Sequence, residues 1–468
     1  MLVVPAVIAA KAASEREQSD ACIGSAEREQ ARLTTKAQTE RRMTVDDLFQ
    51  LVESNSKTLQ ETKISVEFAQ KGIEAARTQR LPDVNATLSA SYNGNVVVMD
   101  RDFTNANGYS SPHFGNSFAL EAQQVVYAGG AIDAGIRIAE LQRDMAVNSQ
   151  RSTLNSQRFL ALGQYLDLYK IQNRMQVMEQ NIELTSRLID DIRAKHEQGM
   201  ALKNDVTRYE LQKENLRLSL RKLQDQQVVL NHQLCKTLGL TDVIIQPDTT
   251  ILLTPPLAPP LQGRGAATAL SSSGEGSEGS WQAQAMANSP LMEQSLLSTQ
   301  IAEQQLKLAK SELLPKVAVV AADNFSGPFI YDIPPIDKNI NYWYVGVGVK
   351  YPISSLFKQN KKVQQARIDI RRSQEHQRVT AETLDNQVQQ AYTLYQQSYV
   401  DLDTRRKSVE LARQNYQVVS DRYLNQLALI TDMLDASNIR LNAELQEVDA
   451  RINIVYAYYK MKFIAGVL

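Results

Sequence analysis

Two carboxylates near the end of the chain are spaced so that they can act as a pair on a cation or a proton. Asp432 and Asp435 stand three positions apart, so on a continuous helix they share one face. Paired carboxylates attract cations, and their mutual repulsion is relieved by protonation or by cation binding. The alternative is a solvated helix face whose acids have no special role. The two residues alone leave both interpretations open.

The rest of the sequence offers no catalytic or metal-binding pattern. The four histidines lack metal-ligand spacing, Cys22 and Cys235 lack CxxC spacing, and no Ser-His-Asp or Cys-His arrangement is indicated. Residues 263–265 lack the preceding strand and the Lys-Ser/Thr of a phosphate loop. Lys plus Arg number 51 against 52 Asp plus Glu, and no basic block interleaves with aromatics. We therefore expect no enzyme, no cofactor, no metal and no nucleic-acid partner.

The two acids lie in a segment that the chain contains twice. Residues 199–206 have a counterpart in residues 426–433, so Asp432 corresponds to Asp205, 227 positions earlier. The apolar pattern that precedes each segment keeps the same offset. A repeat of this length marks two copies of one structural unit.

Each copy is predicted to contain a helix, a β-hairpin and a coiled-coil hairpin. Alternating apolar and polar residues predict the strands, and apolar residues at alternating spacings of three and four predict long antiparallel coiled coils. The first helix is predicted to run unbroken from Thr44 to about Arg80, where Leu-Pro forms a sharp helix-to-strand junction. The predicted boundaries are 44–240 for the first copy, with a hairpin at 84–127 and a turn near 199–205, and 289–468 for the second, with a hairpin at 316–351 and a turn near 426–432.

Three segments fall outside the copies. Residues 1–13 form an apolar run that ends in small residues, which indicates either a signal peptide with a clipped start or an incidental run. Residues 14–43 are charged and are predicted to be a disordered extension. Residues 241–288 are rich in Pro, Gly and Ser and are predicted to be a linker. No segment approaches the roughly 20 apolar residues of a spanning helix, so any membrane crossing is expected to use strands.

The predicted strands have one apolar face. We expect this face to meet outer-membrane lipid, and the alternative is an ordinary sheet face buried against helices. Barrels in outer membranes start at about eight strands, so the four strands of one chain predict a pore shared between chains. The residues expected to face lipid are Phe118, Trp343, Val345, Val347 and Tyr351.

In their order, and in duplicate, these features resemble the TolC-like outer-membrane efflux channel family over roughly 43–468. The resemblance implies a mostly α fold with a small β component, in which a homotrimer forms a 12-stranded outer-membrane barrel and a 12-helix periplasmic tunnel. The chain departs from the family pattern in three places. Gln426 replaces the family's glycine in the second turn, the fourth strand is rich in glycine, and the N-terminus is not typical of a member. The motifs that carry the resemblance are Leu81-Pro82, Leu314-Pro315, Tyr127-Ala128-Gly129-Gly130, Pro352-Ile353, the turn at 199–206 and the run at 432–436.

The resemblance also implies roles for particular residues. Asp432 and Asp435 would line the narrow periplasmic end of the tunnel, where threefold symmetry makes six carboxylates. Tyr423 matches a position that holds the entrance closed, with core packing as the competing account. The tips of the coiled coils would contact an adaptor, and the alternative is that their apolar residues only close each turn. The expected tip residues are Gly199, Met200, Ala201, Leu202 and Asp205 in the first copy and Leu427, Ala428 and Leu429 in the second.

The function that follows is a passive channel in the outer membrane of a Gram-negative bacterium. It would serve a tripartite efflux pump or a type I secretion system, together with a periplasmic adaptor (membrane fusion) protein and an inner-membrane transporter. The alternative is a soluble coiled-coil scaffold or tether without a pore. The sequence does not identify the cargo.

Overall fold

The computed structural model of the chain describes residues 39–241, 243–248, 278–425 and 427–468. These residues form two compact units, and each unit draws on both sequence copies. The coiled-coil unit comprises the described residues of Met1–Gln60, Thr153–Ala285 and Asn386–Leu468. The sheet unit comprises Glu61–Ser152 and Met286–Asp385. The duplication of the sequence therefore does not coincide with the division into compact units.

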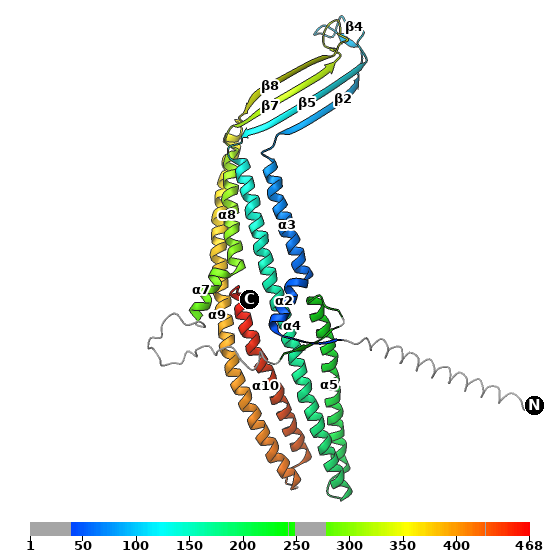
Figure 1. Cartoon of the computed structure of the whole chain (residues 1–468), viewed down its shortest axis with the longest axis vertical. Coiled ribbons are helices and arrows are strands. Elements are labelled where there is room, and N and C mark those ends of the chain that lie inside the picture. The colour runs from blue at the N-terminus through cyan, green and yellow to red at the C-terminus, as the bar shows by residue number, and fades with distance from the viewer. Residues whose placement is uncertain (1–38, 242, 249–277, 426) are drawn as a thin grey trace, which may run out of the picture. The chain divides into compact units, whose positions relative to one another are not determined.

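The sheet unit contains one antiparallel sheet of four strands in the order β2-β5-β7-β8 (Figure 1). Strands β2 and β5 occupy the hairpin expected at 84–127, and β7 and β8 occupy the one expected at 316–351. Pairing of β5 with β7 joins the two hairpins, which the sequence did not predict. The connection from β2 to β5 holds a further small pair, β3 and β4. The bounds are β2 Asp83–Tyr92, β3 Val96–Val98, β4 Asn107–Tyr109, β5 Phe114–Tyr127, β7 Lys316–Gly327 and β8 Ile340–Lys350.

Four helical segments of the sheet unit stand in a row (Figure 1). They are α3 (Lys57–Thr78), the first part of α4 (Ala131–Glu197), α8 (Pro290–Ser311) and the first part of α9 (Ser355–Leu424). Polar contacts join successive members of the row. Arg80 pairs with Asp133 at 2.6 Å, Asn148 Nδ2 donates to Pro290 O at 2.7 Å, and the hydroxyls of Thr299 and Ser373 are 3.0 Å apart.

The prediction of one unbroken helix from Thr44 to about Arg80 is wrong. Helix α2 (Val45–Asn55) has the expected Thr44 cap, but Ser56 is extended and a second helix, α3, begins at Lys57. The Ser56 side chain explains the break, because its Oγ accepts the backbone N–H of Leu59 at 3.4 Å, as an N-cap does. A serine cap inside an apolar period is a signal that periodicity alone overlooks.

The coiled-coil unit contains two antiparallel helical hairpins. The first joins the remainder of α4 to α5 (Lys203–Thr237), and the second joins the remainder of α9 to α10 (Ile430–Ile464). Ion pairs tie each hairpin internally, Arg193 with Glu210 and Arg413 with Glu444. The hairpins also bond to each other, since the Arg174 guanidinium binds Asp449 through two nitrogens.

The prediction of a disordered extension through residue 43 is wrong at its last residues. Strand β1 (Thr39–Met43) pairs in parallel with β6 (Val243–Pro247), which lies in the predicted linker. The Asn231 side chain holds β6 against α5, because its Nδ2 donates to Val243 O at 2.8 Å and its Oδ1 accepts from Ile245 N at 2.9 Å. Met43 and Ile245 are buried in the adjacent apolar cluster, which stabilises this small sheet.

Several predicted features lie outside the described residues. They are the signal peptide at 1–13, residues 14–38 of the extension, residues 249–277 of the linker and the Gln426 substitution. The end of the predicted linker is helix α7 (Glu278–Asn288). No helix within the described residues combines the length and the apolar character needed to cross a bilayer.

Candidate gate, tip and membrane-facing surfaces

The tip of the first helical hairpin is a tightly bonded turn. Helix α4 ends at Glu197, and Gly199 takes a φ of +75°, a left-handed conformation that favours glycine. Asp205 closes the other side of the turn, because its Oδ2 accepts the backbone N–H of Leu202 at 3.3 Å. Met200 and Leu202 are 51% and 71% exposed, while Ala201 packs against the apolar core of the tip. The turn therefore presents apolar side chains that it does not need for its own closure.

The tip of the second hairpin repeats this construction. Asp432 Oδ2 accepts the backbone N–H of Leu429 at 3.1 Å, as Asp205 does for Leu202. Leu427 and Leu429 are 76% and 69% exposed, and Ala428 is half-buried. Asp432 thus caps α10, a role that the sequence analysis missed although the matching Asp205 in the first copy could have revealed it.

Asp435 lies one turn further along α10 and is exposed. Within the described part of the chain its carboxylate has no hydrogen bond or ion pair. The structure brings Asp432 and Asp435 onto one continuous helix, as their spacing predicted. Of the two carboxylates, Asp435 is the one that is uncommitted to the fold.

Tyr423 lies near the end of α9, half-buried against the core of the tips. The ammonium of Lys195, from α4, lies 5.6 Å from the centre of its ring, a cation–π contact between the two hairpins. Burial, and secondly the charge of Asp205, raises the pKa of the Tyr423 hydroxyl. Tyr423 therefore contacts both hairpins within one chain, while it also occupies a core position.

A further cation–π contact, which was not foreseen, lies within the second hairpin, and its arginine also reaches the first. The Arg440 guanidinium lies 4.0 Å from the centre of the Tyr416 ring, and it donates to Asn181 Oδ1 at 3.0 Å. Tyr209 is 1% exposed, and its hydroxyl has no hydrogen-bond partner among the described residues. Burial, and then the neighbouring Tyr416, Tyr423 and Asp205, raises the pKa of Tyr209. The tip core thus combines close packing with an unsatisfied polar group, which costs about 1–3 kcal/mol.

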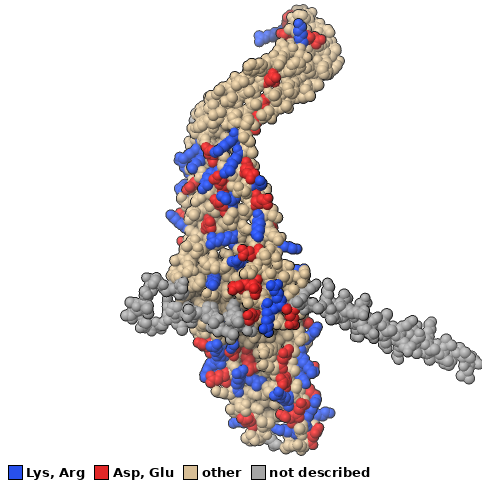
Figure 2. Space-filling view, in the orientation of Figure 1, with Lys and Arg blue, Asp and Glu red and all other residues tan. Residues whose placement is uncertain are grey.

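The sheet has one apolar face, and this face is open. Its strand register aligns Leu88 with Phe118 and Phe325, and Ala321 with Val345. Trp343 is 74% exposed, so the sheet is not buried against helices within the described residues. Figure 2 shows the sheet almost free of charged side chains. The residues that the sequence assigned to lipid are all exposed: Phe118, Trp343, Val345, Val347 and, just beyond β8, Tyr351.

The opposite face of the sheet is more polar, although Val320, Tyr342 and Tyr344 also lie on it. Asn85, Thr87 and Ser89 alternate with the apolar residues of β2, and Glu121 and Asn324 lie on the same side of β5 and β7. One acid, Asp323, interrupts the apolar face opposite Trp343. Its Oδ1 is buried without a partner in the described residues. A sheet with one apolar and one polar face, both uncovered, suits a wall between lipid and water.

Among the described side chains, no group of three or more His, Cys, Asp and Glu is close enough to hold a metal ion. Cys235 is buried, with its Sγ 3.2 Å from Val243 O, and burial raises the pKa of its thiol. This cysteine therefore packs as a small apolar residue.

Comparison with protein families gives a match over most of the chain. The family described as outer membrane efflux protein matches residues 48–240 and 281–467. The two matched segments correspond to the two copies seen in the sequence. No curated protein sequence matches the chain.

Comparison with solved structures gives the same fold. The outer-membrane channel OprN has a TM-score of 0.70 at 15% identity, covering 91% of this chain and 90% of its own. CusC has a TM-score of 0.73 at 13% identity, with coverage of 90% and 91%. VceC from Vibrio cholerae has a TM-score of 0.69 at 14% identity, with coverage of 90% and 96%. At these identities the likeness establishes the fold alone.

Proposed function

The chain belongs to the outer membrane efflux protein family, and from this premise we propose that three identical copies form one passive channel. As a member of this family it is an efflux protein of the bacterial outer membrane. In the proposed assembly a periplasmic adaptor protein links the channel to an inner-membrane transporter, which supplies the energy. The family membership favours this function over the soluble scaffold.

The observation that carries the proposal is the sheet with two open edges. Among the described residues, β2 and β8 each leave one edge without a partner strand, and these strands have 10 and 11 residues. Long unpaired edges seek further strands, and four strands are fewer than the roughly eight of the smallest outer-membrane barrels. Pairing β8 of one copy with β2 of the next closes a 12-stranded barrel from three copies, with the apolar face towards lipid.

The helices offer a second contact between copies. Leu211 and Leu218 lie seven residues apart on α5 and are 63% and 55% exposed. Leu411 and Val418 have the same spacing on α9 and are 54% and 55% exposed. Apolar residues at heptad spacing bury themselves by packing against another helix. In a closed ring of copies, α5 of one copy would pack against α9 of the next.

We assign the gate to Asp432, Asp435 and Tyr423. Three copies would set six carboxylates around the axis at the tip end of the helices, where they would attract cations. Repulsion among the ionised carboxylates would favour a wider passage, and protonation or cation binding would allow it to narrow. The carboxylate of Asp435 is free of the helix cap, whereas that of Asp432 also accepts the Leu429 N–H. Tyr423 would hold the second hairpin against Lys195 of the first.

We assign adaptor contact to the two tips. Their exposed Met200, Leu202, Leu427 and Leu429 exceed what a solvated turn requires, and exposed apolar clusters mark contact surfaces. Gly199, Ala201, Asp205 and Ala428 would shape the turns that present them. The geometry of both tips is alike, so an adaptor with repeated hairpins could contact both.

The test is reconstitution of the purified full chain. We expect a heat-dissociable oligomer of three copies in detergent and discrete current steps when it is added to a planar bilayer. A β8 edge variant, Val347→Pro, is expected to abolish the oligomer, because proline cannot donate to a neighbouring strand. The control is Val347→Ala, which keeps the backbone N–H and is expected to preserve the oligomer. A monomer that stays soluble without detergent would refute the proposal.

A further inference from the structure

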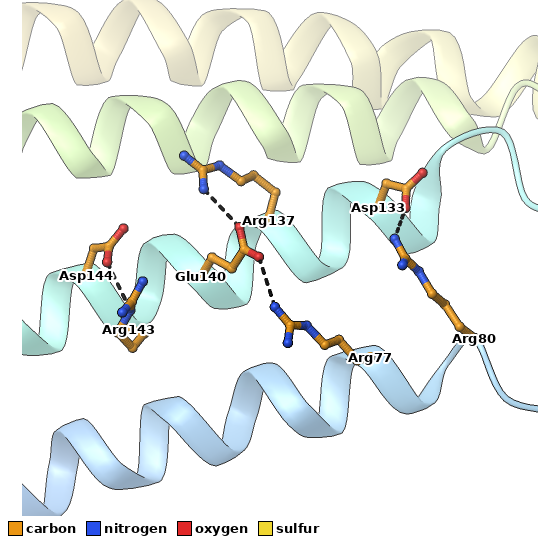
Figure 3. Close-up of polar contacts among 7 residues, drawn as sticks. All are labelled: Arg77, Arg80, Asp133, Arg137, Glu140, Arg143 and Asp144. Atoms are coloured by element: carbon orange, nitrogen blue, oxygen red, sulfur yellow. Dashed lines mark hydrogen bonds and ion pairs between the residues drawn. The ribbon is translucent and has the colours of Figure 1, made fainter.

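The four junctions between helices and sheet differ in how their charges are neutralised. At the start of β2, Arg80 pairs with Asp133 at 2.6 Å, and Arg77 lies 3.6 Å from Glu140, which also accepts from Arg137 at 2.9 Å (Figure 3). At the start of β7, Lys316 pairs with Glu312 at 3.0 Å. Each of these four cations therefore has an anionic partner within the chain.

The junction from β8 to α9 is different. It carries a basic cluster, which we define as Lys358, Lys361 and Lys362, and no acid occurs between Lys350 and Asp369. All three side chains are exposed. Among the described residues none of the three ammonium groups has an ion pair or a hydrogen bond. The first turn of α9 has no acid either, although the helix dipole favours anions there.

Apolar side chains are interspersed with this basic cluster. Tyr351, Ile353 and Phe357 are 42%, 67% and 80% exposed, and we call them the anchor residues. They continue the apolar face of β8, where Val349 is 67% exposed, beyond the end of the strand. On α9, Phe357 and Lys361 are one turn apart and therefore share a face, opposite the buried Val363. Apolar residues at the rim of a membrane-facing strand, followed at once by lysines, are typical of the boundary between acyl chains and headgroups.

We propose that the β8–α9 junction binds the headgroups of anionic phospholipids in the periplasmic leaflet of the outer membrane. The lysine ammonium groups contact the lipid phosphates, and the anchor residues lie among the adjoining acyl chains. Charge complementarity selects this occupant, because three unpaired cations attract anions that the described part of the chain does not supply. Its place on the periplasmic side rests on the proposed function, in which the sheet spans the membrane and the helices extend into the periplasm.

The test offers the purified full chain equal amounts of phosphatidylglycerol, which is anionic, and phosphatidylcholine, which is zwitterionic. Native mass spectrometry then counts the lipids of each kind that remain bound. Each lysine beside an anionic surface contributes about fivefold in binding, so three could contribute up to about 100-fold. We expect the wild-type chain to retain at least about tenfold more phosphatidylglycerol than phosphatidylcholine. The triple variant Lys358→Gln, Lys361→Gln, Lys362→Gln is expected to lose this preference.

A matched variant removes the same charge elsewhere. Lys203→Gln, Lys213→Gln, Lys222→Gln takes three lysines from α5, and it is expected to keep the preference. The proposal is overturned if the wild type binds both lipids equally, or if the junction variant keeps its preference. It is also overturned if that variant loses its oligomer with the preference intact, because the lysines then belong to a contact between copies.

Flotation of the wild-type chain with phosphatidylcholine vesicles separates this proposal from the proposed function. A chain that floats but shows no preference for phosphatidylglycerol refutes the lipid site and leaves the membrane location standing. A chain that does not float refutes the proposed function, and the lipid site with it.

Discussion

Asp432 serves the helix cap as well as the proposed gate, and substitutions can separate the two roles. Asp432→Asn keeps a side-chain oxygen that can accept the Leu429 N–H, and it removes one negative charge. Asp432→Ala removes both the acceptor and the charge. Asp435→Asn removes a charge from a side chain that caps nothing. The first copy provides a control, because Asp205 caps Leu202 in the same way.

The expected magnitudes follow from the two roles. Loss of a cap costs about 1 kcal/mol, so Asp432→Ala and Asp205→Ala should each raise the opening of their own tip about fivefold. For the charge, a cation about 8 Å from a carboxylate in water gains about 0.5 kcal/mol per unit charge. A divalent cation facing three carboxylates would gain about 3 kcal/mol, which 0.1 M salt reduces by about half. Removing one ring of three should therefore weaken divalent binding about tenfold.

The assay is block of the single-channel current by Mg²⁺ in planar bilayers, with hydrogen exchange at the tips measured alongside. We expect Asp432→Asn and Asp435→Asn each to raise the half-blocking concentration about tenfold, and the double variant to raise the conductance as well. Asp205→Asn should leave the block unchanged. The gate assignment fails if Asp435→Asn leaves the half-blocking concentration unaltered, or if Asp205→Asn raises it as much as Asp432→Asn.

Three further predictions concern the coiled-coil unit. Tyr209→Phe removes a buried hydroxyl without a described partner and should stabilise the first tip by about 1 kcal/mol, seen as slower hydrogen exchange early in α5, whereas Tyr209→Leu should speed exchange by leaving a cavity. Asn231→Ala removes both bonds to β6 and should cost about 1–3 kcal/mol in heat denaturation, while Asn215→Ala on the exposed face of α5 should have little effect. Burial raises the pKa of Tyr165 from 10.0 to about 12, so its contribution to the free energy of unfolding is present below pH 10 and should be lost, by about 3 kcal/mol, as the pH rises through about 12. Tyr165→Phe should be less stable at neutral pH, because the wild-type hydroxyl donates to Met43 O and accepts from Asp248 N. The variant should also lack the loss of stability near pH 12. An unchanged alkaline loss of stability in the variant would contradict the assignment to Tyr165.

The features that the sequence predicted well are those with local signals. The Thr44 cap, the long helices with heptad seams, the Leu-Pro junctions and the glycine turn at 199 are all decided by residues within one or two turns of each other. The duplication added information, since a pattern seen twice identifies a turn that one copy would leave ambiguous. The residues of the apolar sheet face were also predictable, because alternation along a strand fixes which side chains share a face.

The features that the sequence did not predict depend on distant partners. Pairing of β1 with β6 joins residues about 200 positions apart, and nothing in the charged segment at 39–43 indicates a strand. The register between β5 and β7 likewise links the two copies without a connecting turn. Arg440 was missed for the same reason, since its contacts are Tyr416 on α9 and Asn181 on α4. Local patterns cannot specify which of many compatible elements becomes the neighbour.

The duplication explains how the two tips can share one turn structure and still differ in surface charge. At the offset of 227 residues, buried Val206 corresponds to buried Met433, so both tips present the same kind of core residue. Elsewhere in that core the copies differ in size at matching positions. Tyr209 corresponds to the smaller Ala436, and Ile189 corresponds to the larger Tyr416. Such pairs fill a shared core without overpacking it. The surface is free of this constraint, and there Asp435 corresponds to Arg208. The packed positions are held by the core that the two tips share, so the charge of a tip can change at the exposed positions without disturbing the turn.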